Sequence, residues 1–198
     1  LGLRAKLLEL IAAEIQRWEA GQGGTIMAKM NSLEDPEIIR ALYQASCAGV
    51  PVFLNVRGIC CLQPGVAGMS ENIHVVSIVD RFLEHSRIFY FYQGGEEKVF
   101  ISSADWMPRN LDRRIELLVP IEDPSAMQIL IDALQIYFAD NVKSWKLQED
   151  GTYTRSSPSA DESRVRSQEV LYRKAREIAG LSRRPRRTSF EPHLSPLK

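Results

Sequence analysis

The sequence predicts an α/β fold in which helices flank a mixed β-sheet. Two segments open with Asp-Pro, at 35–36 and 123–124, and continue with apolar residues at helical spacing. The run at 51–58, Pro-Val-Phe-Leu-Asn-Val-Arg-Gly, is almost continuously apolar, which suits a strand covered by helices on both faces. Gln-Gly-Gly-Glu-Glu at 93–97 separates two strand-like runs, as a hairpin turn does. Together, βα units followed by an antiparallel stretch predict this fold class.

The first half of the chain alternates between helix and strand. Apolar residues recur at helical spacing over 3–19, which predicts an amphipathic helix packed on a core. A strand is expected at 25–31. The next helix has Asp35 as its cap, Pro36 as its first residue and Gly49 as its stop. The strand at 51–58 follows, and residues 60–72 then form a loop rich in turn residues.

The second half predicts the antiparallel part of the sheet and two more helices. Strands are expected at 73–79, 87–92, 98–103 and 113–121, with a polar connection at 104–112. A helix follows from Asp123, a small hairpin pairs 144–148 with 152–155, and a charged helix covers 160–180. We divide the chain into a domain at 1–155, a C-terminal helix at 156–180 that packs on it, and a disordered basic tail at 181–198.

Composition is that of an ordinary globular protein. The 198 residues are 44% hydrophobic and carry no net charge, so nothing draws the whole chain toward nucleic acid or acidic lipid. Three cysteines without a Cys-x-x-Cys pair favour a reducing, cytoplasmic location and indicate no zinc site. No apolar run reaches the ~20 residues of a membrane span. The chain starts without Met and inside a helical pattern, so we expect it to be a piece of a longer protein.

His85 and Arg87 are the first candidates for chemistry. If the strand extends over 84–92, the two side chains project from the same face. An imidazole exchanges a proton or attacks phosphorus near neutral pH, and a guanidinium matches phosphate oxygens with two parallel hydrogen bonds. The alternative is a histidine that merely begins a strand. His74 lies among apolar residues and is interpreted as structural, and His193 belongs to the tail.

Other charged residues stand where predicted strands end. Arg57 closes the run at 51–58, and the carboxyl ends of parallel strands are where α/β sheets bind ligands. It is either an anion ligand or the partner of a local carboxylate. Lys29 and Asn31 end the strand at 25–31, and each either faces an anion or is simply an exposed strand-end residue. A carboxylate such as Glu116 near His85 would hold its tautomer, although a surface loop with solvated ion pairs is equally consistent.

Several long stretches resemble one enzyme family. They are AKMNSLEDPEIIRALYQASCAGVPVFLNVRGICCLQPG, SENIHVVSIVDRFLEHSRIFYF, VFISSADWMPRNLDRRIELLVPI and VRSQEVLYRKAR, which together with their surroundings cover about residues 3–178. They are similar to the C-terminal catalytic part of the bacterial polyphosphate kinases that synthesise long chains. The resemblance implies a phospholipase D-like fold, in which each half-site brings His-x-Lys and then Gly-Ser-x-Asn. Here His85-Ser86-Arg87 and Ser102 to Asp105 stand in those places, with Arg for Lys and Asp for Asn.

The resemblance also implies an activity. In that family the terminal phosphate of ATP passes reversibly through a phosphohistidine to inorganic polyphosphate, and the phosphorylated histidine belongs to a preceding domain that is absent here. His85 matches a second, catalytic histidine that assists at the nucleotide, and Arg57 matches a contact to the ATP phosphates. From strand geometry we add Arg87 as a phosphate ligand and Glu116 as a supporting residue, and Asp105, in the place of the family motif's Asn, is the second supporting residue.

The implied partners follow from the same resemblance. They are ATP or ADP as substrate, inorganic polyphosphate, the preceding part of the chain, a homo-oligomeric assembly and Mg²⁺ in the intact enzyme. No nucleic acid, membrane span or metal ligand set is expected in this piece, which should lack kinase activity alone. The alternatives are a phospholipase D-like phosphodiesterase half-site, against which Arg87 and Asp105 argue, and a non-catalytic regulatory or assembly domain.

Overall fold

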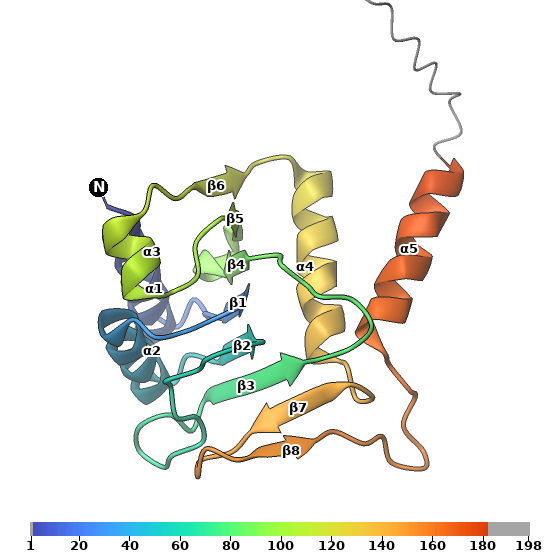
Figure 1. Cartoon of the computed structure of the whole chain (residues 1–198). Helices are drawn as coiled ribbons and strands as arrows, with labels where there is room; N and C mark the ends of the chain where they lie inside the picture. The colour runs from blue at the N-terminus through green and yellow to red at the C-terminus, as the bar shows by residue number, and fades with distance from the viewer. Residues whose placement is uncertain (1, 182–198) are drawn as a thin grey trace, which may run out of the picture.

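One mixed sheet of eight strands forms the centre of the molecule (Figure 1). The computed structural model describes residues 2–181. The strand order is β6-β5-β4-β1-β2-β3-β7-β8. The strands are β1 Ile26–Met30, β2 Val52–Val56, β3 Ile73–Ile78, β4 Ile88–Phe91, β5 Lys98–Ser102, β6 Leu118–Ile121, β7 Ser144–Leu147 and β8 Tyr153–Arg155. The predicted α/β fold with a mixed sheet is therefore confirmed.

The directions of the strands decide which loops meet. β1, β2 and β3 run parallel, and each remaining pair of neighbours is antiparallel. β5 therefore points the same way as β1. The carboxyl ends of β1, β2, β3 and β5 consequently lie at the same end of the sheet as the amino ends of β4, β6 and β7. We call this the carboxyl end of the sheet.

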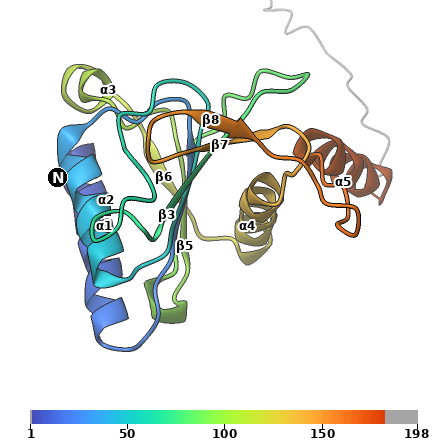
Figure 2. The same ribbon diagram turned by 90° about the horizontal axis from the view of Figure 1, so that it is seen from below.

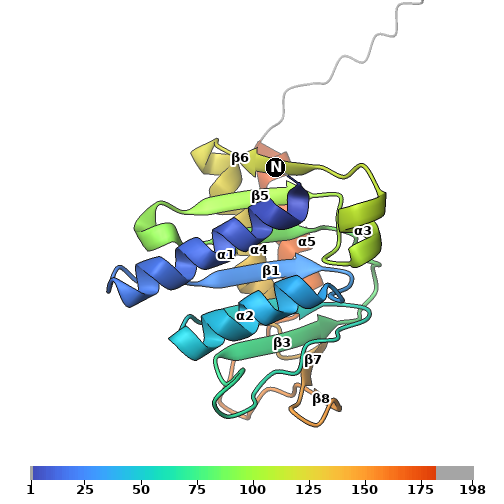
Figure 3. The same cartoon turned by 90° about the vertical axis from the view of Figure 1, so that its left-hand side faces the viewer.

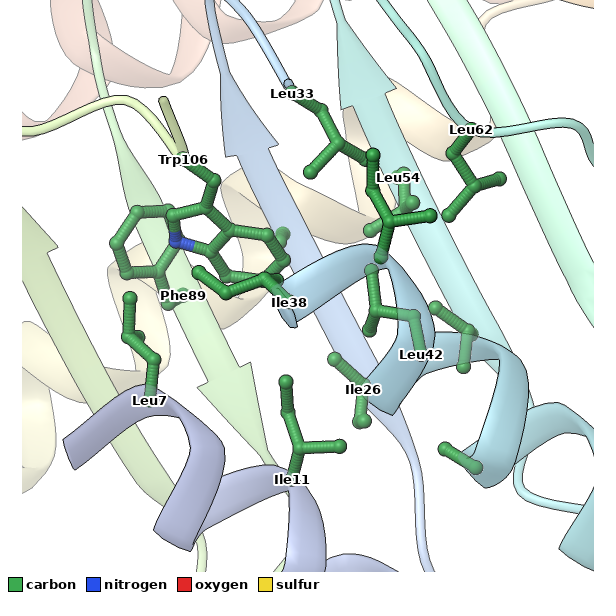
Figure 4. Close-up of a cluster of buried hydrophobic side chains, with 14 of the residues drawn as sticks. Leu7, Ile11, Ile26, Leu33, Ile38, Leu42, Leu54, Leu62, Phe89 and Trp106 are labelled. Atoms are coloured by element: carbon green, nitrogen blue, oxygen red, sulfur yellow. The ribbon is translucent and has the colours of Figure 1, made fainter. Parts of the chain in front are cut away.

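Helices cover both faces of the sheet (Figure 2). α1 Leu3–Glu19 and α2 Pro36–Ala48 lie on one face, where Leu7, Ile38 and other apolar side chains pack against β1, β2 and β4 (Figure 4). α4 Pro124–Phe138 lies on the other face and contacts a smaller cluster that includes Ile88 and Tyr90. Because both faces are covered, β1 and β2 are apolar almost throughout, as the sequence suggested.

The Asp-Pro segments start helices as expected. The Asp35 carboxylate accepts hydrogen bonds from the backbone N–H groups of Glu37 and Ile38, and Asp123 accepts one from Ala126. Gly49 ends α2 with a φ of 100°, a conformation that other residues adopt at a cost. The expected hairpin of β7 and β8 is also present.

Some predicted boundaries were wrong. The connection at 104–112 contains a short helix, α3 Pro108–Arg113, with Pro108 in its first turn. The strand expected from residue 113 begins only at Leu118, so Glu116 lies in the segment before β6. Likewise β4 begins at Ile88, so His85 and Arg87 precede the strand rather than occupy its first positions.

The last helix, α5 Ser167–Leu181, starts later than the expected residue 160. Its first turn is held by Asp140, whose carboxylate accepts hydrogen bonds from the N–H and the hydroxyl of Ser167 at 2.7 Å each. α5 also contacts α4. The division of the chain at residue 155 stays a prediction. Of the predicted tail at 181–198, Leu181 belongs to α5, and residues 182–198 lie outside the described residues. Within residues 2–181, no helix is both long enough and apolar enough to cross a bilayer.

Candidate functional site

All five predicted site residues lie at the carboxyl end of the sheet. Arg57 directly follows β2, His85 and Arg87 precede β4, Asp105 follows β5, and Glu116 precedes β6. Figure 3 shows this end on the side where α3 lies and where the heads of the β1 and β3 arrows point. Residues as far apart in the chain as Arg57 and Glu116 are thereby brought to one edge of the sheet.

A chain of hydrogen bonds connects three of these residues. Nη2 of Arg57 donates to Oδ1 of Asn31 at 2.8 Å, just beyond the end of β1. The backbone N–H of Asn31 donates to Oδ1 of Asp105 at 2.7 Å. Asp105 in turn receives Nε and Nη2 of Arg87 at 3.0 and 3.1 Å, a two-pronged ion pair. We call Arg57, Asn31, Asp105 and Arg87 the strand-end network.

Asp105 is the acidic centre of the strand-end network. Its side chain is only 7% exposed and that of Arg87 is 17% exposed. Burial alone raises the pKa of the Asp105 carboxyl, but the hydrogen bonds from Arg87 and Asn31 outweigh it, and the pKa lies below its ordinary value. The carboxylate therefore stays ionised and orients two groups at once.

His85 presents an exposed side chain next to this network. Its backbone carbonyl accepts a hydrogen bond from Nη1 of Arg87 at 3.0 Å. The side chain is exposed rather than enclosed in apolar packing, so it is accessible to a ligand. His74, by contrast, stacks on Phe53 with ring centroids 5.3 Å apart on the α4 side.

Glu84, the residue before His85, is held by buried groups that do not belong to the strand-end network. Nζ of Lys29 lies 3.1 Å from Oε2 of Glu84, with side-chain exposures of 2% and 12%. Nε2 of Gln168, in α5, donates to Oε1 of Glu84 at 2.8 Å. Lys29 also lies over the ring of Tyr137, 5.1 Å from its centroid. We call Lys29, Glu84, Tyr137 and Gln168 the buried anchor.

Burial shifts the pKa of two side chains in the buried anchor. It lowers the pKa of Lys29, against the opposing influence of Glu84. It also raises the pKa of Tyr137, and the charge of Glu84 adds to that shift. The suggestion that Lys29 faces an anion in solution was therefore wrong, because its ammonium is directed at an internal carboxylate.

Glu116 binds neighbours within its own loop. One carboxylate oxygen accepts from the hydroxyl of Ser103, and the other accepts from Nδ2 of Asn110 at 2.5 Å. The hydrogen bond from Ser103 is the main reason that the pKa of Glu116 lies below its ordinary value. Both oxygens are thus engaged, and Glu116 shapes the loop between β5 and β6 that also carries Asp105.

The carboxylates here do not suit a metal ion. Asp105 accepts four hydrogen bonds from Arg87 and Asn31, and each carboxylate oxygen of Glu116 accepts one, from Ser103 or Asn110. Among residues 2–181, no group of three His, Cys, Asp or Glu side chains is placed to hold a metal. The magnesium implied by the resemblance therefore has no ligand set of this kind in the described part of the chain, and we assign no step through it.

Sequence reasoning missed several contributors. Asn31 is the link between the two arginines rather than an anion ligand, and Glu84 and Gln168 were not considered. Lys29 carried a usable signal, because a lysine within the apolar run Ile-Met-Ala-Lys-Met must find a buried partner. Nothing local indicates Gln168, which is 84 residues away from Glu84.

Comparison with known proteins adds the family. Residues 1–168 match the model described as "Polyphosphate kinase C-terminal domain 2". This chain belongs to the polyphosphate kinase family. The resemblance of the four long sequence stretches to the polyphosphate kinases is thereby confirmed.

Two curated polyphosphate kinases illustrate the similarity. That of Rhodopirellula baltica is 55% identical over 193 residues, which is 98% of this chain and 23% of the relative. That of Pseudomonas aeruginosa is 52% identical over 172 residues, which is 87% of this chain and 25% of the relative. The chain thus spans about a quarter of the length of these curated relatives.

A solved structure of a polyphosphate kinase agrees with this assignment. The polyphosphate kinase from Porphyromonas gingivalis superposes with a TM-score of 0.87 at 42% identity, covering 91% of this chain and 28% of that one. Nuc from Salmonella typhimurium, a phospholipase D family member, gives a TM-score of 0.49 at 16% identity. The high score with the Porphyromonas gingivalis enzyme shows that the present chain has the fold of the matching part of a polyphosphate kinase.

Proposed function

We propose that this chain forms the nucleotide-phosphate side of an ATP:polyphosphate phosphotransferase active site. The observation that carries the proposal is the strand-end network beside an exposed imidazole, in a chain of the polyphosphate kinase family. The reaction moves the terminal phosphate of ATP reversibly to inorganic polyphosphate. The phosphate-accepting histidine would be supplied by the preceding part of the intact enzyme, and the chain alone is inactive.

Arg57 is the best phosphate ligand in this proposal. Only one of its nitrogens is engaged within the strand-end network, by Asn31. The remaining N–H groups can donate to phosphate oxygens and neutralise the charge that spreads over them during transfer. Asn31 fixes the orientation of the fork, so little freedom is lost when a phosphate binds.

His85 acts at the bridging oxygen between the β- and γ-phosphates. An imidazolium there donates a proton or a hydrogen bond to the leaving oxygen of ADP, and the neutral imidazole takes it back in the reverse direction. Arg87 has five N–H groups, of which three bind Asp105 and the His85 carbonyl. It therefore positions the segment of His85 first, and contacts phosphate through the two N–H groups that remain. Asp105 and Glu116 support the loops.

The remaining features of the intact enzyme belong to the same proposal. ATP or ADP and inorganic polyphosphate are its substrates, and Mg²⁺ accompanies the nucleotide phosphates rather than a carboxylate of this chain. The enzyme is a cytoplasmic homo-oligomer. A phospholipase D-like phosphodiesterase is the second candidate, but Asp105 is an ionised acceptor engaged with Arg87, where that chemistry would use an amide.

The test is ATP binding by the 198-residue chain, measured by titration calorimetry. Because a charge-assisted hydrogen bond contributes about 1.5–3 kcal/mol, R57Q should weaken ATP binding by about tenfold or more. R40Q is the matched control, since Arg40 is an exposed arginine of α2. It should leave the Kd unchanged. Equal ATP binding by the unmodified chain and R57Q would contradict the proposal.

A second measurement addresses His85. In the intact kinase that carries this chain, H85A should reduce polyphosphate synthesis by about 10²-fold or more, because general acid–base help is lost. Near-normal synthesis by H85A would remove His85 from the mechanism. Hydrolysis of a phosphodiester such as bis(p-nitrophenyl) phosphate by the chain, with no ATP binding, would favour the phosphodiesterase instead.

A further inference from the structure

A second basic region lies at the edge of the sheet, beyond the strand-end network. A hollow of about 430 Å³ opens between the β7–β8 hairpin and the first turns of α5. Its lining contains five basic side chains, namely Lys143, Arg155, Arg164, Arg166 and Arg173. The only acidic residue in the lining is Glu169. We call these five residues the basic hollow.

Most of this positive charge is not neutralised. Arg166 is engaged, because it forms a two-pronged pair with Asp80 at 2.7 Å and also binds Glu169 at 2.5 Å. The other four cations have no carboxylate within ion-pair distance among residues 2–181. Four unpaired cations in one concave surface raise the local concentration of anions.

The hollow continues in two directions. One neighbouring hollow shares Arg166 and Glu169 with it and leads to Phe82 and Tyr172. The other, of about 310 Å³, shares Val142, Arg155 and Arg164 with it and extends along residues 156–158. A surface of this shape suits an extended anion better than a single phosphate group. Arg155 and Arg164 line both parts, which makes them the centre of the surface.

The basic hollow and the strand-end network lie at the same end of the sheet. β7 starts opposite the end of β3, with Ser144 paired to Ile78, and β8 ends at Arg155 beside Trp145. Only β3 separates β2, which leads to Arg57, from β7, so the strands are about 10 Å apart at the usual spacing. Figure 1 shows the segment after β3 running from this edge past α4 and α5 to β4.

That segment connects the two regions physically. Asp80 holds Arg166 of the basic hollow, Gln168 binds the backbone N–H and carbonyl of Phe82, and Glu84 belongs to the buried anchor. His85 follows immediately. A linear anion seated in the basic hollow is therefore next to the segment that carries His85.

We propose that the basic hollow binds inorganic polyphosphate, as a holding site for the part of the chain that is not reacting. This inference rests on the proposed function, because it takes polyphosphate as the substrate. Inorganic polyphosphate carries about one charge per phosphate, and only a bridging oxygen joins one phosphorus atom to the next. A row of guanidinium forks therefore matches it. Holding the distal part of the chain keeps its end near the site between transfers.

The lining favours polyphosphate over single-stranded nucleic acid. Proteins that bind single strands combine basic grooves with aromatic side chains on which bases stack. The apolar residues of this lining are Val142 and Val170, and it contains no aromatic ring. The lining of the basic hollow itself offers charge without a stacking surface, as a polymer of phosphate alone requires. The exposed rings of Phe82 and Tyr172 line the adjoining hollow that shares only Arg166 and Glu169 with it, and the oligonucleotide competition below tests whether they contribute.

The experiment is a titration of the full 198-residue chain with a fluorescently labelled long-chain inorganic polyphosphate. The variant is R155Q/R164Q, and the matched control is R40Q/K98Q, which removes two exposed positive charges from α2 and β5. We expect R155Q/R164Q to weaken binding by about tenfold or more, since a basic residue contributes about 1 kcal/mol at an anionic surface. The control should lose less than about twofold, and binding by the unmodified chain should fall steeply with salt.

Each other outcome would overturn the inference. Equal losses in R155Q/R164Q and R40Q/K98Q would mean that only net charge matters. A loss confined to R183Q/R184Q/R186Q/R187Q would assign binding to the arginines beyond residue 181. Equal competition by a single-stranded oligonucleotide of the same charge would make the hollow a general polyanion surface. Absence of polyphosphate binding would show that the hollow is not a holding site for polyphosphate. ATP titration of R57Q reports the proposed function separately, so the two ideas can fail independently.

Discussion

Arg87 of the strand-end network and the exposed arginines of the basic hollow serve in opposite ways. In the network, Arg87 is 17% exposed and is fixed by a carboxylate that is itself buried. In the hollow, Arg155, Arg164 and Arg173 are exposed and have no carboxylate partner among the described residues. Paired and buried cations provide geometry, because their directions are set before a ligand arrives. Unpaired and exposed cations provide attraction, because their charge is still available.

The difference fits the two tasks of the proposed polyphosphate-making phosphotransferase. Transfer of one phosphate needs donors placed to within a fraction of an ångström, which is why oriented groups are effective there. Retention of a long, flexible polyanion needs charge and tolerates several binding geometries. The predictions below test whether the two regions differ as this comparison requires.

The largest effect is expected at the buried anchor. K29M removes the ammonium and leaves Glu84, only 12% exposed, without its cation. Breaking a buried pair on one side costs about 3–5 kcal/mol in the free energy of unfolding, which urea denaturation measures. The double variant K29M/E84Q should recover a large part of this loss, because no buried charge is then left unpaired. A single variant as stable as the unmodified chain would show that the anchor contributes nothing.

A smaller, pH-dependent effect is expected for Asp105. D105N keeps the shape of the side chain but loses the charge that Arg87 binds, and should cost about 1.5–3 kcal/mol near neutral pH. Because the folded-state pKa of Asp105 lies below the ordinary ~3.9, its contribution is complete above that value and is lost as the pH falls through the folded pKa. Urea titrations of both proteins from neutral to acidic pH measure the difference.

The comparison between the two proteins isolates Asp105 from other acidic groups. Asp80 also has a lowered pKa, mainly through its hydrogen bonds with Arg166, and it titrates in both proteins alike. The stability difference between the unmodified chain and D105N should therefore shrink as the pH falls below about 4. A difference that stays constant down to the acid limit would contradict the assignment of the ionised form.

The parts of the fold that the sequence predicted are those with local signals. Asp35, Pro36 and Gly49 bound α2 through contacts within a few residues, so reading them requires no knowledge of the sheet. α3 was missed because six residues give too little periodicity, and the signal of Pro108 was hidden among polar neighbours. The strand order β6-β5-β4-β1-β2-β3-β7-β8 has no local signal, because it depends on which strands, distant in the sequence, pair along their edges.

The candidate site divides in the same way. The rule that ligands bind at the carboxyl ends of parallel strands located Arg57, and strand direction brings the other residues to that edge. Which groups bond to one another was beyond such a rule. Asn31 and Asp105 are 74 residues apart, and the strand assumed over 84–92 was too long, because β4 covers only Ile88–Phe91.

The smallest change in the free energy of unfolding is expected in the basic hollow. It is also the most direct test of the difference between the two regions. Arg155 and Arg164 are exposed, and the one hydrogen bond that their side chains form within residues 2–181, from Nη2 of Arg155 to the Val142 carbonyl, is long at 3.5 Å. R155Q/R164Q should therefore change the free energy of unfolding by less than about 0.5 kcal/mol, as surface substitutions usually do. Relief of repulsion between neighbouring cations would even make the change stabilising. A loss of stability comparable with that of D105N in the same urea assay would mean that these arginines are structural, and the distinction between cations that orient and cations that attract would then fail.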